Sequence, residues 1–229
     1  MNDIIQAIAV YALPVLFAIT LHEAAHAYAA KYFGDDTAHS QGRMSLNPLR
    51  HIDPFGTVVL PILLFMATKQ ALDFPMMFGY AKPVPVEFSR LRNPKKQMAF
   101  VALAGPAANF IMAVGWLIVA IFVTNLQVAE LYPLKVAQAG VLINAGMFVF
   151  NLLPIPPLDG SRVVYSLLPH RMAIQYGKIE PYGMFIVLGL LVLQTQNILP
   201  LLALWFMPMM AMTYTVLGWV VFPLRLLLG

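Results

Sequence analysis

Long apolar runs separated by short polar segments dominate the pattern of this chain. About 20 consecutive apolar residues are enough for a helix to cross a bilayer. Runs of this length extend over Ile4 to about Ala30, Met98 to Thr124, Val136 to Leu158 and Pro181 to Leu224. The last run is interrupted by the polar residues 194–197 before Pro200, so it predicts two helices joined by a tight turn. The pattern predicts an all-α polytopic membrane protein with five to six transmembrane helices.

A shorter apolar stretch, Pro54 to Thr68, follows the first long run and predicts a different element. It has about 15 residues, which is short for a span. It is followed by Phe78 to Val86, where alternating prolines cannot continue a helix and favour extended backbone. Two topologies remain open. Residues 54–81 form either a re-entrant helix/β-hairpin element or one ordinary short span.

Lysine and arginine are unevenly distributed over the polar segments. Segments 31–53, 82–97 and 162–178 hold three, five and three of them, whereas the stretch between Thr124 and Val136 holds only Lys135. The positive-inside tendency makes the first three segments cytoplasmic. The chain between 31–53 and 82–97 must then cross the membrane an even number of times, which favours the re-entrant element. Non-helical backbone at that depth needs a cover of protein or a watery cavity.

Composition narrows the class further. Hydrophobic residues make up 60% of the 229 residues and charged residues 10%, with a mean hydropathy of +0.76, whereas a soluble domain is usually about 25% charged. The net charge of +4 is explained by Lys and Arg on one side of a bilayer, and no basic patch with interleaved aromatics suggests a nucleic-acid partner. Because the chain has no cysteine, any metal must be held by histidine and carboxylate. The N-terminus lacks a basic signal-peptide region, so we expect the first helix to be retained.

The first apolar run leads into His22-Glu23-Ala24-Ala25-His26. Ionisable residues at membrane depth are costly and are functional by default. Residues four apart share a helix face, so His22 and His26 can both offer a ring nitrogen to one metal. Glu23 then comes close enough to act on a water at that metal. This motif on a membrane helix predicts a hydrolytic zinc site.

A third metal ligand is expected from the sequence Asn151-Leu-Leu-Pro-Ile-Pro-Pro-Leu-Asp159-Gly160, which ends the run from Val136. Two histidines and one carboxylate, with one position left for water, are a common ligand set of catalytic zinc. Asp159 could instead simply end a helix in a Pro-Gly turn. The predicted topology puts His22, Asp159 and the stretch 105–109 at one level of the membrane, which favours Asp159 as a ligand.

The stretch Gly105-Pro106-Ala107-Ala108-Asn109 supplies one further polar residue at this level. Asn109 lies one turn beyond the helix-kinking Pro106. We expect its side chain to hydrogen-bond backbone or a ligand histidine as an outer partner of the metal site, rather than to touch substrate.

Together these three motifs resemble the signatures of the site-2 protease family of intramembrane zinc metalloproteases, over about residues 10–165. The resemblance implies hydrolysis of a peptide bond within or near a transmembrane helix of a single-span substrate protein, with one zinc per chain. Carried over by position, His22, His26 and Asp159 bind the zinc, Glu23 is the base and Asn151 supports the reacting carbonyl. The implied location is the bacterial cytoplasmic membrane, with the active site toward the cytoplasmic side.

The stretch Phe78 to Val86, with Arg43 to Pro48, resembles the membrane-embedded β-element that family members place beside the substrate. This implies substrate contacts from Tyr80, Lys82, Val84 and Val86. No insertion large enough for a PDZ domain lies between the second and third core spans, and we expect no nucleotide-sensing tail after residue 229. We therefore expect a minimal form of the family, a single domain over 1–229 with its core at about 4–168 and accessory helices over 181–229.

Two functions of other classes remain as alternatives. A membrane metal transporter could use the same ligands, but transport sites usually need further polar residues along a path. The last two spans offer none apart from the turn at 194–197. An inactive relative could bind transmembrane partners without cutting them, and the intact Glu23 argues against it.

Overall fold

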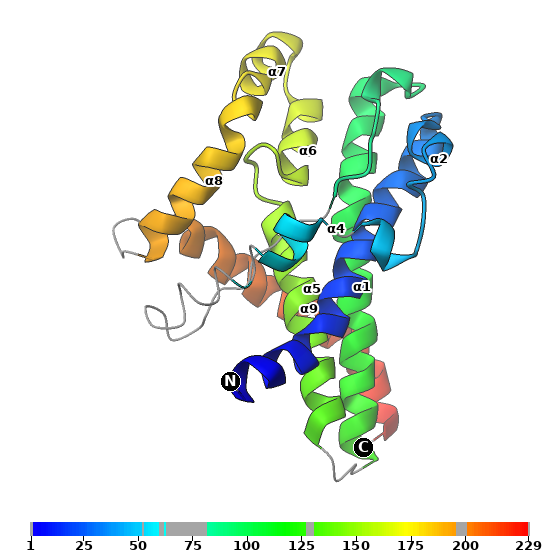
Figure 1. Cartoon of the computed structure of the whole chain (residues 1–229), viewed down its shortest axis with the longest axis vertical. Coiled ribbons are helices and arrows are strands. Elements are labelled where there is room, and N and C mark those ends of the chain that lie inside the picture. Colours follow the sequence, from blue (N-terminus) through cyan, green and yellow to red (C-terminus); the bar gives the residue numbers. More distant parts are fainter. Residues whose placement is uncertain are drawn as a thin grey trace.

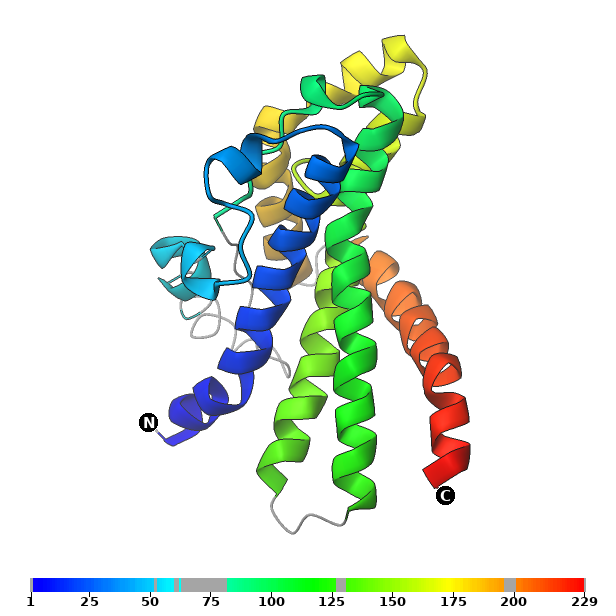
Figure 2. The ribbon, with the colours of Figure 1, turned by 90° about the vertical axis from the view of Figure 1, so that its right-hand side faces the viewer.

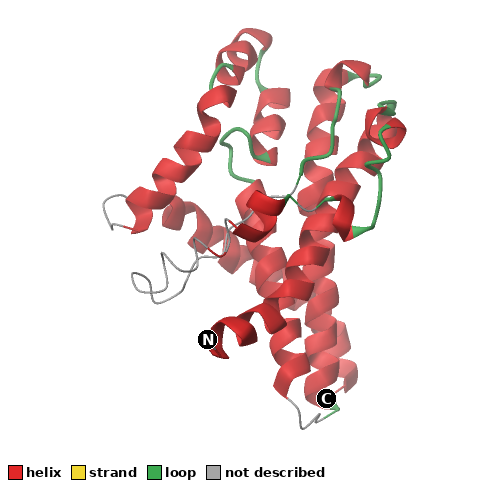
Figure 3. Ribbon diagram, viewed as in Figure 1, coloured by secondary structure: helices red, strands yellow, loops and turns green. Residues whose placement is uncertain are grey.

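A computed structural model of the chain describes residues 2–51, 53–59, 62, 82–126, 131–195 and 201–228. Helices dominate these residues, and none of them forms a strand (Figure 3). The helices are α1 (Asn2–Phe33), α2 (Thr37–Ser40), α4 (Pro94–Asn125), α5 (Leu131–Asn151), α6 (Asp159–Leu167), α7 (His170–Gly177), α8 (Glu180–Thr195) and α9 (Leu201–Leu228). Three short helical turns are η1 (Pro48–Arg50), η2 (Pro54–Val59) and η3 (Phe88–Arg90). The predicted all-α class is confirmed.

Four of the helices, α1, α4, α5 and α9, are long and apolar enough to cross a membrane. The prediction of five to six spanning helices is therefore too high for the described residues. The run from Pro181 does divide into two helices, α8 and α9. However, α8 has 16 residues, and at 1.5 Å per residue its length of about 24 Å falls short of a hydrocarbon core of about 30 Å.

The centre of the molecule is formed by α1, α4 and α5, which lie side by side (Figures 1 and 2). Small residues allow the close approach. A Cβ at Gly140 of α5 would overlap the Trp116 ring of α4, and Ala24 and Ala27 of α1 are buried. Helix α9 covers α4 and α5 through Leu217, which is fully buried.

The connection between α5 and α6 corrects one predicted boundary. The third apolar run was expected to continue as helix to Leu158, but α5 ends at Asn151 and an irregular loop follows over 152–158. The loop contains three prolines, which cannot continue a helix. As a result α6 begins at Asp159 and packs against α4, which brings that carboxylate toward α1.

Residues 82–87, called here the extended segment because their alternating prolines favour extended backbone, form neither helix nor strand, and the backbone of Glu87 is extended. The segment is attached at its start, where the Lys82 N–H donates to the His51 carbonyl at 3.0 Å. Val84 is buried against Ala27 of α1. Most of the predicted re-entrant element, at 60–61 and 63–81, lies outside the described residues, so the choice between a hairpin and a single span stays a prediction.

Candidate metal centre

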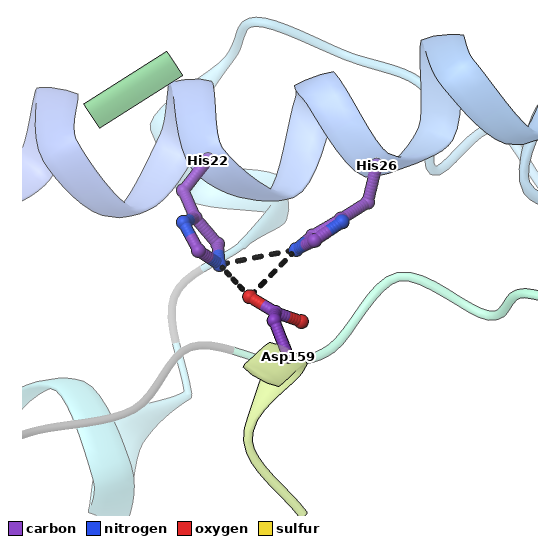
Figure 4. A group of neighbouring side chains, drawn as sticks. All are labelled: His22, His26 and Asp159. Carbon is purple, nitrogen blue, oxygen red and sulfur yellow. Dashed lines mark hydrogen bonds and ion pairs between the residues drawn. The ribbon is translucent and has the colours of Figure 1, made fainter. Parts of the chain in front are cut away.

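His22, His26 and Asp159 point toward one another from α1 and the first turn of α6 (Figure 4). The two Nε2 atoms are 3.1 Å apart, and Asp159 Oδ2 lies 3.2 Å from His22 Nε2 and 3.3 Å from His26 Nε2. Both histidines are buried and Asp159 is half-buried. The structure thus brings together the three side chains that the sequence predicted as metal ligands.

Hydrogen bonds on the far side of each imidazole define which nitrogen faces the centre. His26 Nδ1 lies 2.7 Å from the Val101 carbonyl oxygen, which can only accept, so we assign the hydrogen to Nδ1. His22 Nδ1 lies 2.6 Å from Asn109 Oδ1 and is assigned in the same way. In the neutral rings each Nε2 then carries a lone pair directed at the other and at Asp159.

Two buried side-chain amides hold the ring of His22 in one orientation. The Asn109 Nδ2 donates to the Ala18 carbonyl at 3.2 Å and to Asn144 Oδ1 at 3.1 Å, which leaves Asn109 Oδ1 for His22. Asn144 Nδ2 in turn donates to the Gly140 carbonyl at 2.9 Å. Asn109 thus occupies the position beside a ligand histidine that the sequence suggested. Asn144 was missed, and its signal was an amide in the middle of an apolar span, where a polar group needs partners.

These residues fit a zinc ion. Asp159 Oδ2 is buried and accepts no hydrogen bond of acceptable geometry, while two imidazole lone pairs face it. Such a group of acceptors is unfavourable without a cation among them, because their partial negative charges repel one another. Two nitrogens and one carboxylate oxygen are a donor set of catalytic zinc. Gly105 of α4 leaves space at this point, since a Cβ there would overlap His26 Nε2 and crowd the His22 ring.

Glu23 lies beside the cluster, half-buried, and connects it to the extended segment. Its Oε2 accepts a hydrogen bond from the Val84 N–H at 2.8 Å. The neighbours Pro83 and Pro85 have no N–H, so Val84 is the backbone donor available at this point. Among the predicted substrate-binding residues, Lys82 is exposed, Val84 is buried and Val86 is half-buried, whereas Tyr80 lies outside the described residues. Their contact with substrate stays a prediction.

Asn151, predicted to support the reacting carbonyl, is the last residue of α5. Its Nδ2 donates to the Met147 carbonyl at 3.0 Å, one turn earlier in the same helix. No hydrogen bond links it to the three clustered side chains in the described part of the chain. Its catalytic role stays a prediction that requires the amide to exchange this partner.

Asp35, two residues after the end of α1, was also missed by the sequence analysis. It is fully buried and accepts hydrogen bonds from the Thr37 N–H and hydroxyl and, at 2.7 Å, from the Glu87 N–H. Burial by itself would raise the pKa of this carboxyl, but the bonds from Thr37 and Glu87 outweigh it and hold the pKa below its ordinary value. Asp35 therefore holds the C-terminal end of the extended segment in place through its hydrogen bond from the Glu87 N–H. The sequence signal was a short Asx-turn pattern, Asp35-Asp36-Thr37.

The fold and the donor set define a candidate metal site on an apolar helix with an acid beside it, an arrangement typical of a metallopeptidase. The sequence profile of peptidase family M50 matches residues 121–194. The chain is 37% identical over 185 residues to "Putative zinc metalloprotease YwhC" of Bacillus subtilis, covering 79% of this chain and 78% of that protein.

Two further relatives carry the name "Putative zinc metalloprotease Rip2". The one from Mycolicibacterium smegmatis is 31% identical over 187 residues, with 80% of this chain and 66% of the relative covered. The one from Mycobacterium tuberculosis is 32% identical over 182 residues, with 78% and 63% covered. No solved structure matches the chain. The chain belongs to peptidase family M50, the site-2 protease family of zinc metalloendopeptidases, which confirms the resemblance seen in its motifs.

Proposed function

We propose that this chain cleaves single-span membrane proteins within or near their transmembrane helix, using a site that opens toward the cytoplasm. The observation that carries the proposal is the position of His22 and His26 on α1, a helix long and apolar enough to span a bilayer. Ligands on such a helix are within reach of a peptide bond that is itself in the membrane. Membership of a peptidase family favours this function over metal transport.

The residues of the site divide the chemistry between them. His22, His26 and Asp159 would hold the zinc, and the hydrogen bonds to Asn109 and the Val101 carbonyl leave both Nε2 lone pairs free for it. A zinc ion held there would supply a Lewis acid for the scissile carbonyl and would lower the pKa of a water toward about 7. The carboxylate of Glu23 is the group that would accept a proton from the attacking water and pass it to the leaving nitrogen.

The extended segment is suited to hold an unwound substrate. A helical substrate hides its amides in its own hydrogen bonds, so it must unwind before hydrolysis. Pro83 and Pro85 have carbonyls but no N–H, and an edge of this kind accepts hydrogen bonds from the N–H groups of an added strand. Because the Val84 N–H contacts Glu23, a strand beside the segment would lie next to the base.

The substitution Glu23→Gln tests the proposed chemistry. The amide keeps the shape of the side chain but cannot take the proton, so the variant should retain zinc and substrate association while turnover is abolished. Membranes of cells expressing Glu23→Gln should accumulate an uncut single-span protein that cells expressing the wild type do not. Appreciable residual proteolysis in the variant would remove Glu23 from the role of base.

Cysteine labelling tests the proposed orientation, and the absence of native cysteine gives a clean background. Single cysteines at Ser45, Ser89 and Ser166 should all react from the cytoplasmic side, because their segments are rich in Lys and Arg. A cysteine at Gln127, between the third and second predicted spans, should react from the opposite side. Labelling of positions 45 and 89 from opposite faces would rule out the re-entrant element and favour a single span at 54–68.

A further inference from the structure

A pocket of about 350 Å³ lies between the loop 41–50 and the start of the extended segment, and none of the three clustered ligands lines it. Its walls are Gln41, Gly42, Arg43, Leu49, Arg50 and Lys82. We call it the basic pocket, because three of these residues are cations and none is acidic. In the described part of the chain, none of the three cations forms an ion pair with a carboxylate. These three positive charges make the pocket attractive to an anion.

Both guanidinium groups are held in place by backbone carbonyls. Arg43 donates from Nη1 to the Arg50 carbonyl at 2.6 Å and from Nη2 to the Lys82 carbonyl at 2.9 Å. Arg50 donates from Nη1 to the Gly42 carbonyl at 2.6 Å. A guanidinium has five N–H donors, so each arginine keeps donors for a ligand in a fixed orientation. Fixed guanidinium donors match the oxygens of a phosphate group well.

Exposed leucines accompany these cations on the same loop. Leu46 is 58% exposed, and Leu49, which lines the basic pocket, is 76% exposed. Large apolar side chains that face outward beside Arg and Lys are typical of segments at the boundary between lipid headgroups and acyl chains. The loop also follows the end of α1, which is one of the four candidate membrane spans. These features place the basic pocket where a phospholipid headgroup would meet it.

We propose that the basic pocket binds the phosphate group of an anionic phospholipid, with the lipid's acyl chains against Leu46 and Leu49. The exposed leucines favour a lipid over free phosphate, because a soluble anion would gain nothing from an apolar wall. The site also bears on the metal centre. Arg43 joins the loop to the Lys82 carbonyl, and two residues later the Val84 N–H contacts Glu23. A bound headgroup therefore holds the extended segment beside the base.

Native mass spectrometry of the purified full chain tests this proposal without any substrate, so its outcome is separate from that of the protease assays. The chain is incubated with phosphatidylglycerol and phosphatidylcholine of the same acyl composition. The wild type should retain phosphatidylglycerol preferentially. Since each cation near a membrane surface contributes a factor of about five, Arg50→Gln should lower this preference about fivefold. Arg50→Lys keeps the charge but not the guanidinium donors, so its preference should lie between those of the wild type and Arg50→Gln.

The matched control is Arg171→Gln, which removes the same charge from an exposed position on α7. It should leave the preference unchanged. Equal retention of the two lipids by the wild type, or an equal loss in Arg171→Gln and Arg50→Gln, would overturn the proposal. Displacement of phosphatidylglycerol by millimolar inorganic phosphate would also overturn it, because the pocket would then be a site for free phosphate.

Discussion

Gly105→Ala is the smallest change that should disable the metal centre from outside its ligand set. Gly105 lies on α4, where an added Cβ would overlap His26 Nε2 and stand 2.6 Å from His22 Cε1. An ordinary van der Waals contact begins near 3.4 Å. The His22 ring, or α4 itself, must therefore retreat by about 0.8 Å, whereas metal–ligand distances tolerate only about ±0.2 Å.

Two opposing effects set the size of the stability change that Gly105→Ala should cause. Replacing a glycine by alanine within a helix gains about 1 kcal/mol from propensity. Overpacking at a filled site costs about 1–3 kcal/mol, so the net effect on folding is small. The effect on zinc is large, because disturbing even an outer partner of a ligand costs 10- to 100-fold in metal affinity. Direct displacement of a ligand ring should therefore lower the zinc affinity about 100-fold or more, which corresponds to about 3 kcal/mol.

Competition with a chelator, measured on purified protein in detergent, provides the assay. Gly115→Ala is the matched control, because it lies on the same helix and a Cβ there meets nothing within 4 Å. This control should bind zinc as the wild type does and be as stable or slightly more stable. Equal zinc affinities for Gly105→Ala and Gly115→Ala would refute the view that Gly105 leaves space for the ligand rings.

Two further substitutions test the residues that hold the site. Asn109→Ala removes the acceptor of His22 Nδ1 and should lower zinc affinity about 10- to 100-fold in the same competition assay. An unchanged zinc affinity would contradict the role of Asn109 in orienting His22. Asp35→Asn turns an amide N–H toward a backbone donor, so it should lower the free energy of unfolding, measured by thermal denaturation, by about 2–3 kcal/mol. The control Asp36→Asn, at an exposed neighbour, should lower it by less than about 0.5 kcal/mol. Because the folded-state pKa of Asp35 is lowered, the stability that Asp35→Asn loses relative to the wild type should be constant between about pH 5 and 8 and shrink as the pH falls below about 4. Similar losses of stability in Asp35→Asn and Asp36→Asn would refute the anchoring role.

The cluster of His22, His26 and Asp159 could be predicted from the sequence, because the two histidines share a helix face and Asp159 lies in a recognisable motif. The spacing of His22 and His26 on one helix face follows from the helical repeat alone. Asp159 was predicted from its motif and from the shared membrane level. The end of α5 at Asn151 was missed, because hydropathy continues through Leu158 and only the prolines mark the break.

Other features depend on packing that the pattern does not contain. Nothing in an apolar run reveals that Gly105 faces two imidazoles or that Asn144 completes the bonding of Asn109, because both depend on how α4 meets α1 and α5. Among the described residues fewer helices can span a membrane than the pattern predicted, because α8, within the charge-free run from Pro181, has only 16 residues.

The central claim, a zinc held by His22, His26 and Asp159, is tested most directly by the metal content of the purified chain. The wild type should carry about one zinc per chain. His26→Ala should lose the zinc, because two remaining ligands are too few for a catalytic site. His39→Ala, which removes an exposed histidine outside the cluster, should keep it. Full zinc occupancy in His26→Ala would contradict the ligand set and with it the active site described above.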